Sequence, residues 1–376
     1  MFTAPEYETL REKAGFRWYV GSGVYALLEL TGTPLGAYNL NPDVCIEVFR
    51  RGRPLFRERF PDAEHISMPG IATPAISYGH VNGLGSELLF PEEGEVAHTH
   101  IYDSLEQGIR ALSKPVDFAT AGMAPFYLDF RRKLQDAFPD ERIGFSYGCE
   151  GPITTAYEMR GDGLFYDIMD FPDLLGEFLE AVCRSINEFW VFYAGVLGIP
   201  TITPNGGGRC DDVASAVPPR LFPTLVLPYW DLYFRGRTTG TRSAHVEDLR
   251  PEQLRFLEEI GLSSFDPSIS ARLDPKTISR ESRVPFTWRL GSFHYLTMTC
   301  DDVQDWVFQA VADGASSVHT HIEAILCEEE HVPKIDAFIA AASEAKRMLD
   351  SGATRADVGA CVSPEGRRRF WGTWPD

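Results

Sequence analysis

Two stretches of the sequence, Ser243-Ala244-His245-Val246-Glu247 and Val318-His319-Thr320-His321-Ile322-Glu323, decide how the fold is interpreted. Each reads as the end of a strand that carries histidine. Residues two apart on an extended segment point to the same side, so His245 and Glu247 can direct two metal-ligand side chains into one space. His321 and the glutamate that follows it repeat this arrangement. If both strands lie in one barrel, the sequence predicts a metal site.

Helical patterns alternate with short apolar runs over the second two-thirds of the chain. The predicted helices run from Pro172 to Gly198, from Pro251 to Gly261, from Asp301 or Asp302 to Gly314, and onward from Pro333. The predicted strands are 199–203, 262–265, 284–290 and 316–322, and 205–208 is predicted to be a loop. Units of about 30 to 40 residues with this order predict parallel βα units. The predicted fold class is therefore α/β, and we expect the parallel strands to close into a (β/α)₈ TIM barrel.

The first 115 residues are less regular. They contain a predicted helix from Asp43 to Phe60, a β-rich middle near Ile76 to Phe90 and a capped helix from Asp103 to Leu112. We interpret 1–115 as an N-terminal elaboration that packs on the barrel and contributes to its start. The main part of the barrel is then 116–350, and 351–376 is a C-terminal tail.

Composition narrows the class of protein. The chain has 376 residues, of which 44% are hydrophobic, and a net charge of −19 from 35 basic and 54 acidic residues. No basic excess exists to displace counterions from a nucleic acid, so small molecules or protein partners are expected. No apolar run approaches the ~20 residues that span a bilayer. Seven cysteines without paired spacing indicate reduced thiols, and we expect a cytoplasmic protein.

The stretch from Tyr147 to Gly161, in which a Gly-Pro turn opens a helix ending in Arg-Gly, resembles the uroporphyrinogen decarboxylase superfamily. Further motifs follow in that family's order: Cys210 to Ser215, Leu227 to Tyr229, His245 to Glu247, the Leu290-Gly291 turn and the strand before Cys327. The resemblance covers roughly residues 40 to 345. It implies a (β/α)₈ barrel with its site at the C-terminal face.

The branches of this superfamily differ in their charged residues. Decarboxylases carry an arginine-rich N-terminal motif that holds the substrate carboxylates, whereas Phe16 to Gly21 of this chain has one arginine. The cobalamin-dependent methyltransferases instead bind zinc through His-x-Cys and a later cysteine. The matching positions here are His245, Glu247 and Cys327, so that glutamate replaces the first cysteine. Three such ligands leave an open position, and a carboxylate makes the metal more Lewis-acidic. His321 and Glu323 remain alternative or additional ligands.

Other candidate residues follow predicted strands. Asp211 and Asp212 could position substrate or accept a proton, or could cap the helix before Val213. Glu150 presents the same choice, and all three carboxylates are predicted catalytic residues. Substrate contacts are predicted for Tyr147, Asn205 and His321, although core packing is the alternative for the tyrosine. His80 is predicted to lie in a turn, so the chain has no corrinoid module of its own.

The resemblance thus predicts a zinc-dependent methyltransferase that moves a methyl group between a small O-, N- or S-methylated compound and the cobalt of a separate corrinoid protein carrying cobalamin. A homodimer is compatible with such a barrel. Three alternatives remain: a decarboxylase of the tetrapyrrole type with a cationic pocket, another zinc hydrolase or lyase on the same barrel, and a non-catalytic small-molecule binding protein.

Overall fold

The computed structural model describes residues 2–60, 65–92 and 94–370. The strands within these ranges are β1 Arg17–Ser22, β2 Ile66–Ser67, β3 Leu88–Leu89, β4 Ala97–His98, β5 Gly207–Cys210, β6 Arg242–His245, β7 Ser264–Asp266, β8 Thr287–Leu290 and β9 Ser317–Ile322. The α-helices are α1 Tyr7–Ala14, α2 Val24–Thr31, α3 Leu35–Leu40, α4 Pro42–Arg59, α5 Gly79–Gly83, α6 Leu105–Leu112, α7 Ala124–Ala137, α8 Pro152–Arg160, α9 Gly163–Asp170, α10 Pro172–Leu197, α11 Phe222–Leu225, α12 Leu227–Arg235, α13 Phe256–Glu259, α14 Pro275–Glu281, α15 Cys300–Ala312, α16 Val332–Asp350, α17 Arg355–Gly359 and α18 Pro364–Phe370.

Most of the strand pairing is parallel. One sheet has the order β2-β1-β9-β8 and another has the order β5-β6-β7, while β3 and β4 form an antiparallel pair. A parallel bridge between Phe265 and Phe286 joins the two parallel sheets, and parallel bridges also link residues 72 and 76 to residues 144 and 147. Between this last segment and β5, the backbone of Gly151 donates a hydrogen bond to Cys210 at 2.6 Å. The prediction of a mixed α/β fold with parallel strands is confirmed.

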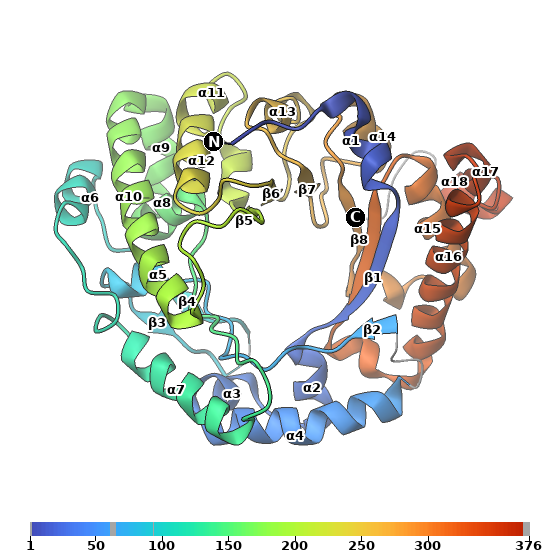
Figure 1. The fold of residues 1–376 in the computed structure, drawn as a ribbon, viewed down its shortest axis with the longest axis horizontal. Coiled ribbons are helices and arrows are strands. Elements are labelled where there is room, and N and C mark those ends of the chain that lie inside the picture. The colour runs from blue at the N-terminus through green and yellow to red at the C-terminus, as the bar shows by residue number, and fades with distance from the viewer. Residues whose placement is uncertain (1, 61–64, 93, 371–376) are drawn as a thin grey trace.

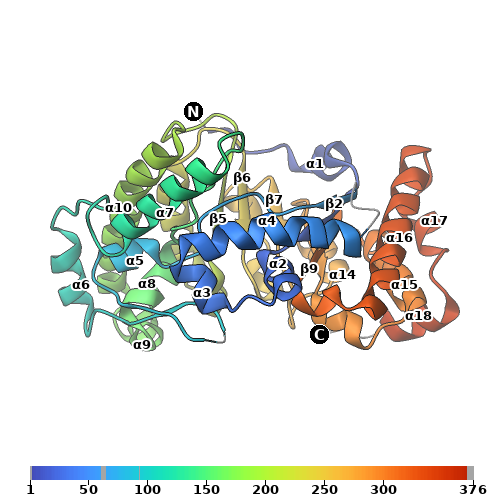
Figure 2. The same ribbon diagram turned by 90° about the horizontal axis from the view of Figure 1, so that it is seen from below.

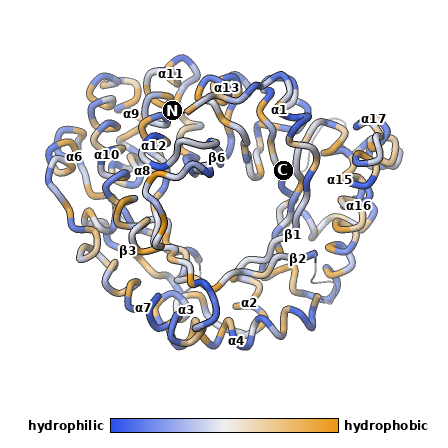
Figure 3. The backbone as a smooth tube through the Cα atoms, viewed as in Figure 1, coloured by the Kyte–Doolittle hydropathy of each residue, from blue (hydrophilic) through white to orange (hydrophobic). Residues whose placement is uncertain are grey.

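Helices form the outer layer of the molecule and the strands lie on its inner side (Figure 1). The view turned by 90° shows α4 crossing the lower side and α15 to α18 grouped at one end (Figure 2). Apolar and polar residues alternate along the outer helices, as expected for elements with one buried face (Figure 3).

The long helix α10 shows how the sequence specifies such an element. Pro172 occupies its first turn, where the missing N–H costs nothing, and Gly198 ends it in a left-handed conformation with φ 66°. Its buried side includes Phe178, Val182 and Ile186. The helix predicted from Pro172 to Gly198 is confirmed.

The predicted strand 199–203 and loop 205–208 are wrong. Thr203 makes an isolated bridge to Thr238, and the regular strand β5 begins at Gly207 within the expected loop. A Cβ atom at Gly207 would lie 3.1 Å from the Thr238 side chain, and one at Gly208 would lie 3.0 Å from Ser243. These glycines permit close strand packing and do not mark a flexible connection.

The predicted β-rich middle from Ile76 to Phe90 is also wrong, because most of it is not extended. It contains helix α5 and the two-residue strand β3. His80, expected in a turn, lies in α5 and is fully buried. A Cβ atom at Gly79 would lie 2.7 Å from the Tyr147 ring, so close packing against a neighbouring segment overrides the local preference.

The N-terminal region supplies strands to the main sheet. Residues Arg17 to Ser22 of β1 pair with Ser317 to Ile322 of β9 along their whole length, and β1 also pairs with β2. At the other end of the chain, α17 and α18 pack on α15. The division into 1–115, 116–350 and 351–376 stays a prediction, and residues 371–376 of the tail lie outside the described residues. None of the described helices is long and apolar enough to cross a membrane.

Candidate functional site

The ends of β5, β6 and β7 bring three side chains to one edge. Cys210 pairs in register with His245, and His245 pairs in register with Asp266. Because the strands are parallel, their carboxyl ends lie side by side, and the residues that follow them gather at the same edge. We call Glu150, Asp212, His245, Glu247 and Asp266 the carboxylate cluster.

The imidazole of His245 is at the centre of this cluster. Its Nδ1 lies 3.0 Å from Oδ2 of Asp266, within hydrogen-bond distance. Its Nε2 lies 3.7 Å from Oε1 of Glu247 and 3.9 Å from Oδ1 of Asp212. The same Asp212 oxygen accepts a hydrogen bond from the backbone N–H of Glu247 at 2.8 Å. The ring is therefore fixed on one side and faces two carboxylates with its other nitrogen.

Mutual proximity changes the proton affinity of these groups. Burial lowers the pKa of His245, but hydrogen bonds to Asp266 and Glu247 and the neighbouring negative charges outweigh it and raise the pKa to about 10. Burial, assisted by the charges of Asp212 and Asp211, raises the pKa of Glu150 to about 7. Burial also raises the pKa of Asp212. Such a group of partly buried carboxylates favours a bound cation, whether proton or metal ion.

The strands β8 and β9 line the neighbouring part of the edge. The ring of His319 stacks on Tyr19 with centroids 4.6 Å apart and meets His321 edge-on at 5.5 Å. Burial lowers the pKa of His319 to about 4, and burial together with the charge of Arg289 lowers the pKa of His321. Both imidazoles are therefore neutral at neutral pH. Burial raises the pKa of Glu323, which also feels the positive charge of Arg289.

Cys327 lies apart from His245 and Glu247. It follows β9 by one short 3₁₀ turn, and its Sγ faces the backbone oxygens of Ala26 at 3.7 Å and Glu323 at 3.8 Å. Burial raises the pKa of the thiol to about 12. Within the described residues, the one group of three or more potential ligands with atoms mutually within 4.8 Å is Glu328, Glu330 and His331. The structure thus does not bring the Cys327 thiol to the His245–Glu247 pair.

Among the predicted catalytic carboxylates, Asp212 and Glu150 belong to the cluster, whereas Asp211 does not. Its side chain is fully buried and accepts hydrogen bonds from the Thr154 backbone N–H at 2.7 Å and from Nε1 of Trp230 at 2.6 Å. Both carboxylate oxygens are therefore used to hold helices α8 and α12. This arrangement matches the helix-holding alternative for Asp211, and its catalytic role stays a prediction.

The predicted substrate contacts are also dispersed. Tyr147 is fully buried, stacks on Tyr127 and donates a hydrogen bond to Asn82, which matches the core-packing alternative for this residue. Asn205 precedes β5, while Asp212 follows it, so the two lie at opposite ends of that strand. Asn205 instead lines a cavity of about 470 Å³ beside α10 and α12. His321 alone of the three lies at the edge that carries the cluster.

Two functional candidates were missed in the sequence. Asp266 ends β7 and anchors His245, and Arg289 of β8 is the positive charge felt by His321 and Glu323. Asp266 directly follows the predicted strand 262–265, Leu-Ser-Ser-Phe, and so occupies the end of a strand, as His245 does. For Arg289 no comparable signal exists, because one arginine within a strand is not distinctive.

No protein-family model and no curated protein matches this chain. A solved structure, described as a methyltransferase from Methanosarcina mazei, is similar in three dimensions with a TM-score of 0.61. The two sequences are 17% identical, and the match covers 92% of this chain and 99% of that chain. At this identity the similarity shows a shared fold.

Proposed function

We propose that the inner strands close a (β/α)₈ barrel. Its eight segments would be β1, 66–76, 144–151, β5, β6, β7, β8 and β9. Parallel pairing or a parallel bridge supports each neighbouring contact except the one between 144–151 and β5, where the hydrogen bond from Gly151 to Cys210 supports it. The carboxylate cluster then lies at the C-terminal face, where barrel enzymes have their active sites.

We propose that the protein is a zinc-dependent methyltransferase acting between a small methylated compound and the cobalt of a separate corrinoid protein. The observation that carries this proposal is the anchored imidazole of His245, whose Nε2 faces Glu247 and Asp212. The similarity in fold to the Methanosarcina mazei methyltransferase supports the same class of reaction. A histidine held by a carboxylate through its other nitrogen is the usual arrangement of a metal ligand.

The residues present fit a zinc ion with a revised ligand set. His245 and Glu247 remain ligands, and we propose Asp212 as the third in place of Cys327. The three ligand atoms are not mutually within 4.8 Å, so binding one ion needs a side-chain rotation. Asp212 and Glu247 are 42% and 46% exposed, which permits that rotation. Bound zinc would supply Lewis acidity that stabilises negative charge on the substrate heteroatom.

Residues of the protein itself would orient the histidine ligand, exchange a proton with the substrate and leave the face open to the partner. Asp266 accepts the Nδ1–H of His245 and so fixes Nε2 as the nitrogen that faces the metal site, where a bound ion would displace the Nε2 proton. Glu150, with its pKa near 7, is suited to exchange a proton with the substrate heteroatom at neutral pH. The exposure of Asp212 and Glu247 leaves the face accessible to a large corrinoid-bearing partner.

The decarboxylase alternative is disfavoured by charge. A tetrapyrrole with many carboxylates needs several cations at the binding site, whereas the cluster consists of four carboxylates around His245, with Arg289 as the cation that acts on the neighbouring His321 and Glu323. The side chain of Arg209, on β5, is fully buried and lies over the Trp230 ring, so it cannot reach a substrate. Polyanions would be repelled.

Zinc analysis of the purified protein tests the ligand set. His245→Ala and Glu247→Gln should each lower the zinc content by one ion per chain, and Cys327→Ser should leave it unchanged. Zinc loss in Cys327→Ser would restore the thiol to the ligand set. Undiminished zinc in both His245→Ala and Glu247→Gln would overturn the site.

A methyl-transfer assay tests the reaction. Methoxy compounds and methylamines are offered with cob(I)alamin as acceptor, and methylation of the cobalamin is followed by absorbance. Transfer by the native protein and at least about a hundredfold loss in His245→Ala are expected, since a metal ligand is removed. A zinc-loaded protein that transfers no methyl group from any of these classes, in either direction, would contradict the proposal.

A further inference from the structure

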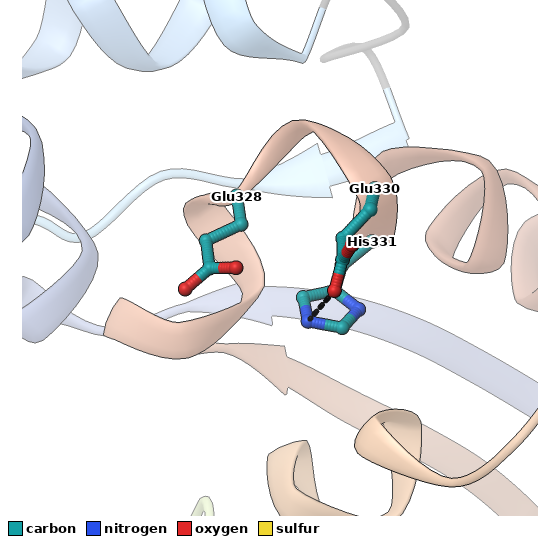
Figure 4. A group of neighbouring side chains, drawn as sticks. All are labelled: Glu328, Glu330 and His331. Carbon is teal, nitrogen blue, oxygen red and sulfur yellow. Dashed lines mark ion pairs between the residues drawn. The ribbon is translucent and has the colours of Figure 1, made fainter.

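A second group of ligand-type residues lies in the turn between β9 and α16. Glu328, Glu330 and His331, which we call the 328–331 turn, place one ligand atom each within 4.8 Å of one another. Glu330 and His331 belong to a short 3₁₀ helix that runs directly into α16. Figure 4 shows the Glu328 carboxylate to one side of the His331 ring and the Glu330 carboxylate at the edge of the ring, with the dashed line marking the contact between Glu330 and a ring nitrogen. None of these residues belongs to the carboxylate cluster.

The burial of the His331 ring is a second, independent observation that points to a ligand at this turn. The residue is 1% exposed, and among the described residues neither ring nitrogen has a hydrogen-bond partner. A buried polar group without a partner is unfavourable, and here both nitrogens are in that position. Nε2 lies 3.7 Å from Oε1 of Glu330, which is too far for a hydrogen bond. Two ligand atoms on one zinc ion are about 3.4 Å apart in tetrahedral geometry, so the separation is close to that of a shared ion.

Charge also favours a cation at this turn. The amino end of α16 contributes about half a positive charge, and Arg59 lies 4.0 Å from Glu329. Three consecutive carboxylates, Glu328 to Glu330, outweigh these two positive contributions. The balance is therefore negative. Glu330 is 75% exposed, so an ion can enter from solvent and water can complete its coordination.

We propose that the 328–331 turn is a binding site for a divalent transition-metal ion, with zinc preferred. One imidazole and two carboxylates suit zinc or manganese, whereas magnesium and calcium prefer ligand sets made only of oxygen. A bound ion would satisfy one nitrogen of His331 and fix the turn after β9 to the start of α16. This role is structural and does not depend on the proposed methyl transfer.

The test uses a background in which the other proposed zinc site is absent. His245→Ala/Glu247→Gln protein is stripped of metal and dialysed against zinc alone, then against manganese alone. One zinc ion per chain should remain bound, and zinc should bind more tightly than manganese. Adding Glu328→Gln and Glu330→Gln should weaken zinc binding at least about tenfold, because both carboxylate ligands are lost.

Glu329→Gln is the matched control. It removes one charge from the same turn, as Glu328→Gln or Glu330→Gln does by itself, but changes a residue that pairs with Arg59 and is not in the group, so zinc affinity should change less than twofold. Equal weakening by Glu329→Gln and by each single change, Glu328→Gln and Glu330→Gln, would mean that charge alone attracts the ion and would overturn the site, as would an absence of bound zinc in the background protein. The glutamates carry the test because His331 is buried and its replacement could unfold the chain.

Discussion

His80 lies fully buried against the rings of Phe118 and Phe189, with Nε2 2.9 Å from the Ser185 hydroxyl. Burial, assisted by the charge of Arg237, lowers its pKa from 6.5 to about 3. The ring is therefore neutral in the folded protein at pH values where the unfolded chain binds a proton. Such a group contributes to stability above pH 6.5, and this contribution is lost as the pH falls toward 3.

We expect the native protein to lose on the order of 4 kcal/mol in its free energy of unfolding between pH 6.5 and pH 3 because of this residue. His80→Gln, whose amide can still reach Ser185, should lose correspondingly less over the same range. Urea unfolding of both proteins across the range measures the difference. Identical pH dependence in the two proteins would mean that His80 is not held neutral by the fold.

At the scale of the element, two glycines at the C-terminal end of α10, Gly195 inside the helix and Gly198 at its cap, have opposite expected effects. Gly198 ends the helix at φ 66°, and an added Cβ would meet no atom within 4 Å, so only the backbone conformation matters. Gly195 lies within the helix, and an added Cβ there would also be free of contacts.

Gly198→Ala should lower the free energy of unfolding by about 1 kcal/mol, because alanine is strained in the left-handed region. Gly195→Ala should raise it by up to about 1 kcal/mol, because alanine loses less conformational entropy in a helix. Thermal or urea unfolding of the two variants beside the native protein gives both values. Destabilisation by both changes would show that space around α10 is tighter than the structure indicates.

At the scale of the whole molecule, the N-terminal region is part of the main sheet. β1 lies between β2 and β9, and the N-terminal helix is also tied to the body because the Tyr7 hydroxyl donates to the Leu262 backbone oxygen at 3.0 Å. A chain reduced to 116–350 would expose the edge of β9 that β1 covers.

We therefore expect 116–350 expressed alone to lack cooperative thermal unfolding. A chain of residues 15–370, which keeps β1 and β2, should unfold cooperatively at a lower temperature than the full protein. Circular dichroism and calorimetry of the two fragments measure this. A cooperative transition in 116–350 would show that the first 115 residues are a dispensable addition.

Some of the site was predictable because it depends on local spacing. His245 and Glu247 are two residues apart at the end of a strand, and Asp212 also follows a strand, so each was expected at a carboxyl edge. Asp211 could not be separated from Asp212 in the same way. Which of two adjacent carboxylates faces solvent depends on Trp230 and Thr154, which lie far along the chain.

The sequence by itself determined the elements whose signals are local: the alternation of helices and strands, the start of α10 at Pro172 and its end at Gly198. The tertiary structure decided which side chains meet. It joined Asp266 to His245 through strand register and turned the Cys327 thiol toward the Ala26 backbone oxygen. These outcomes depend on packing between segments that are distant in the chain, and residue periodicity carries no information about that packing.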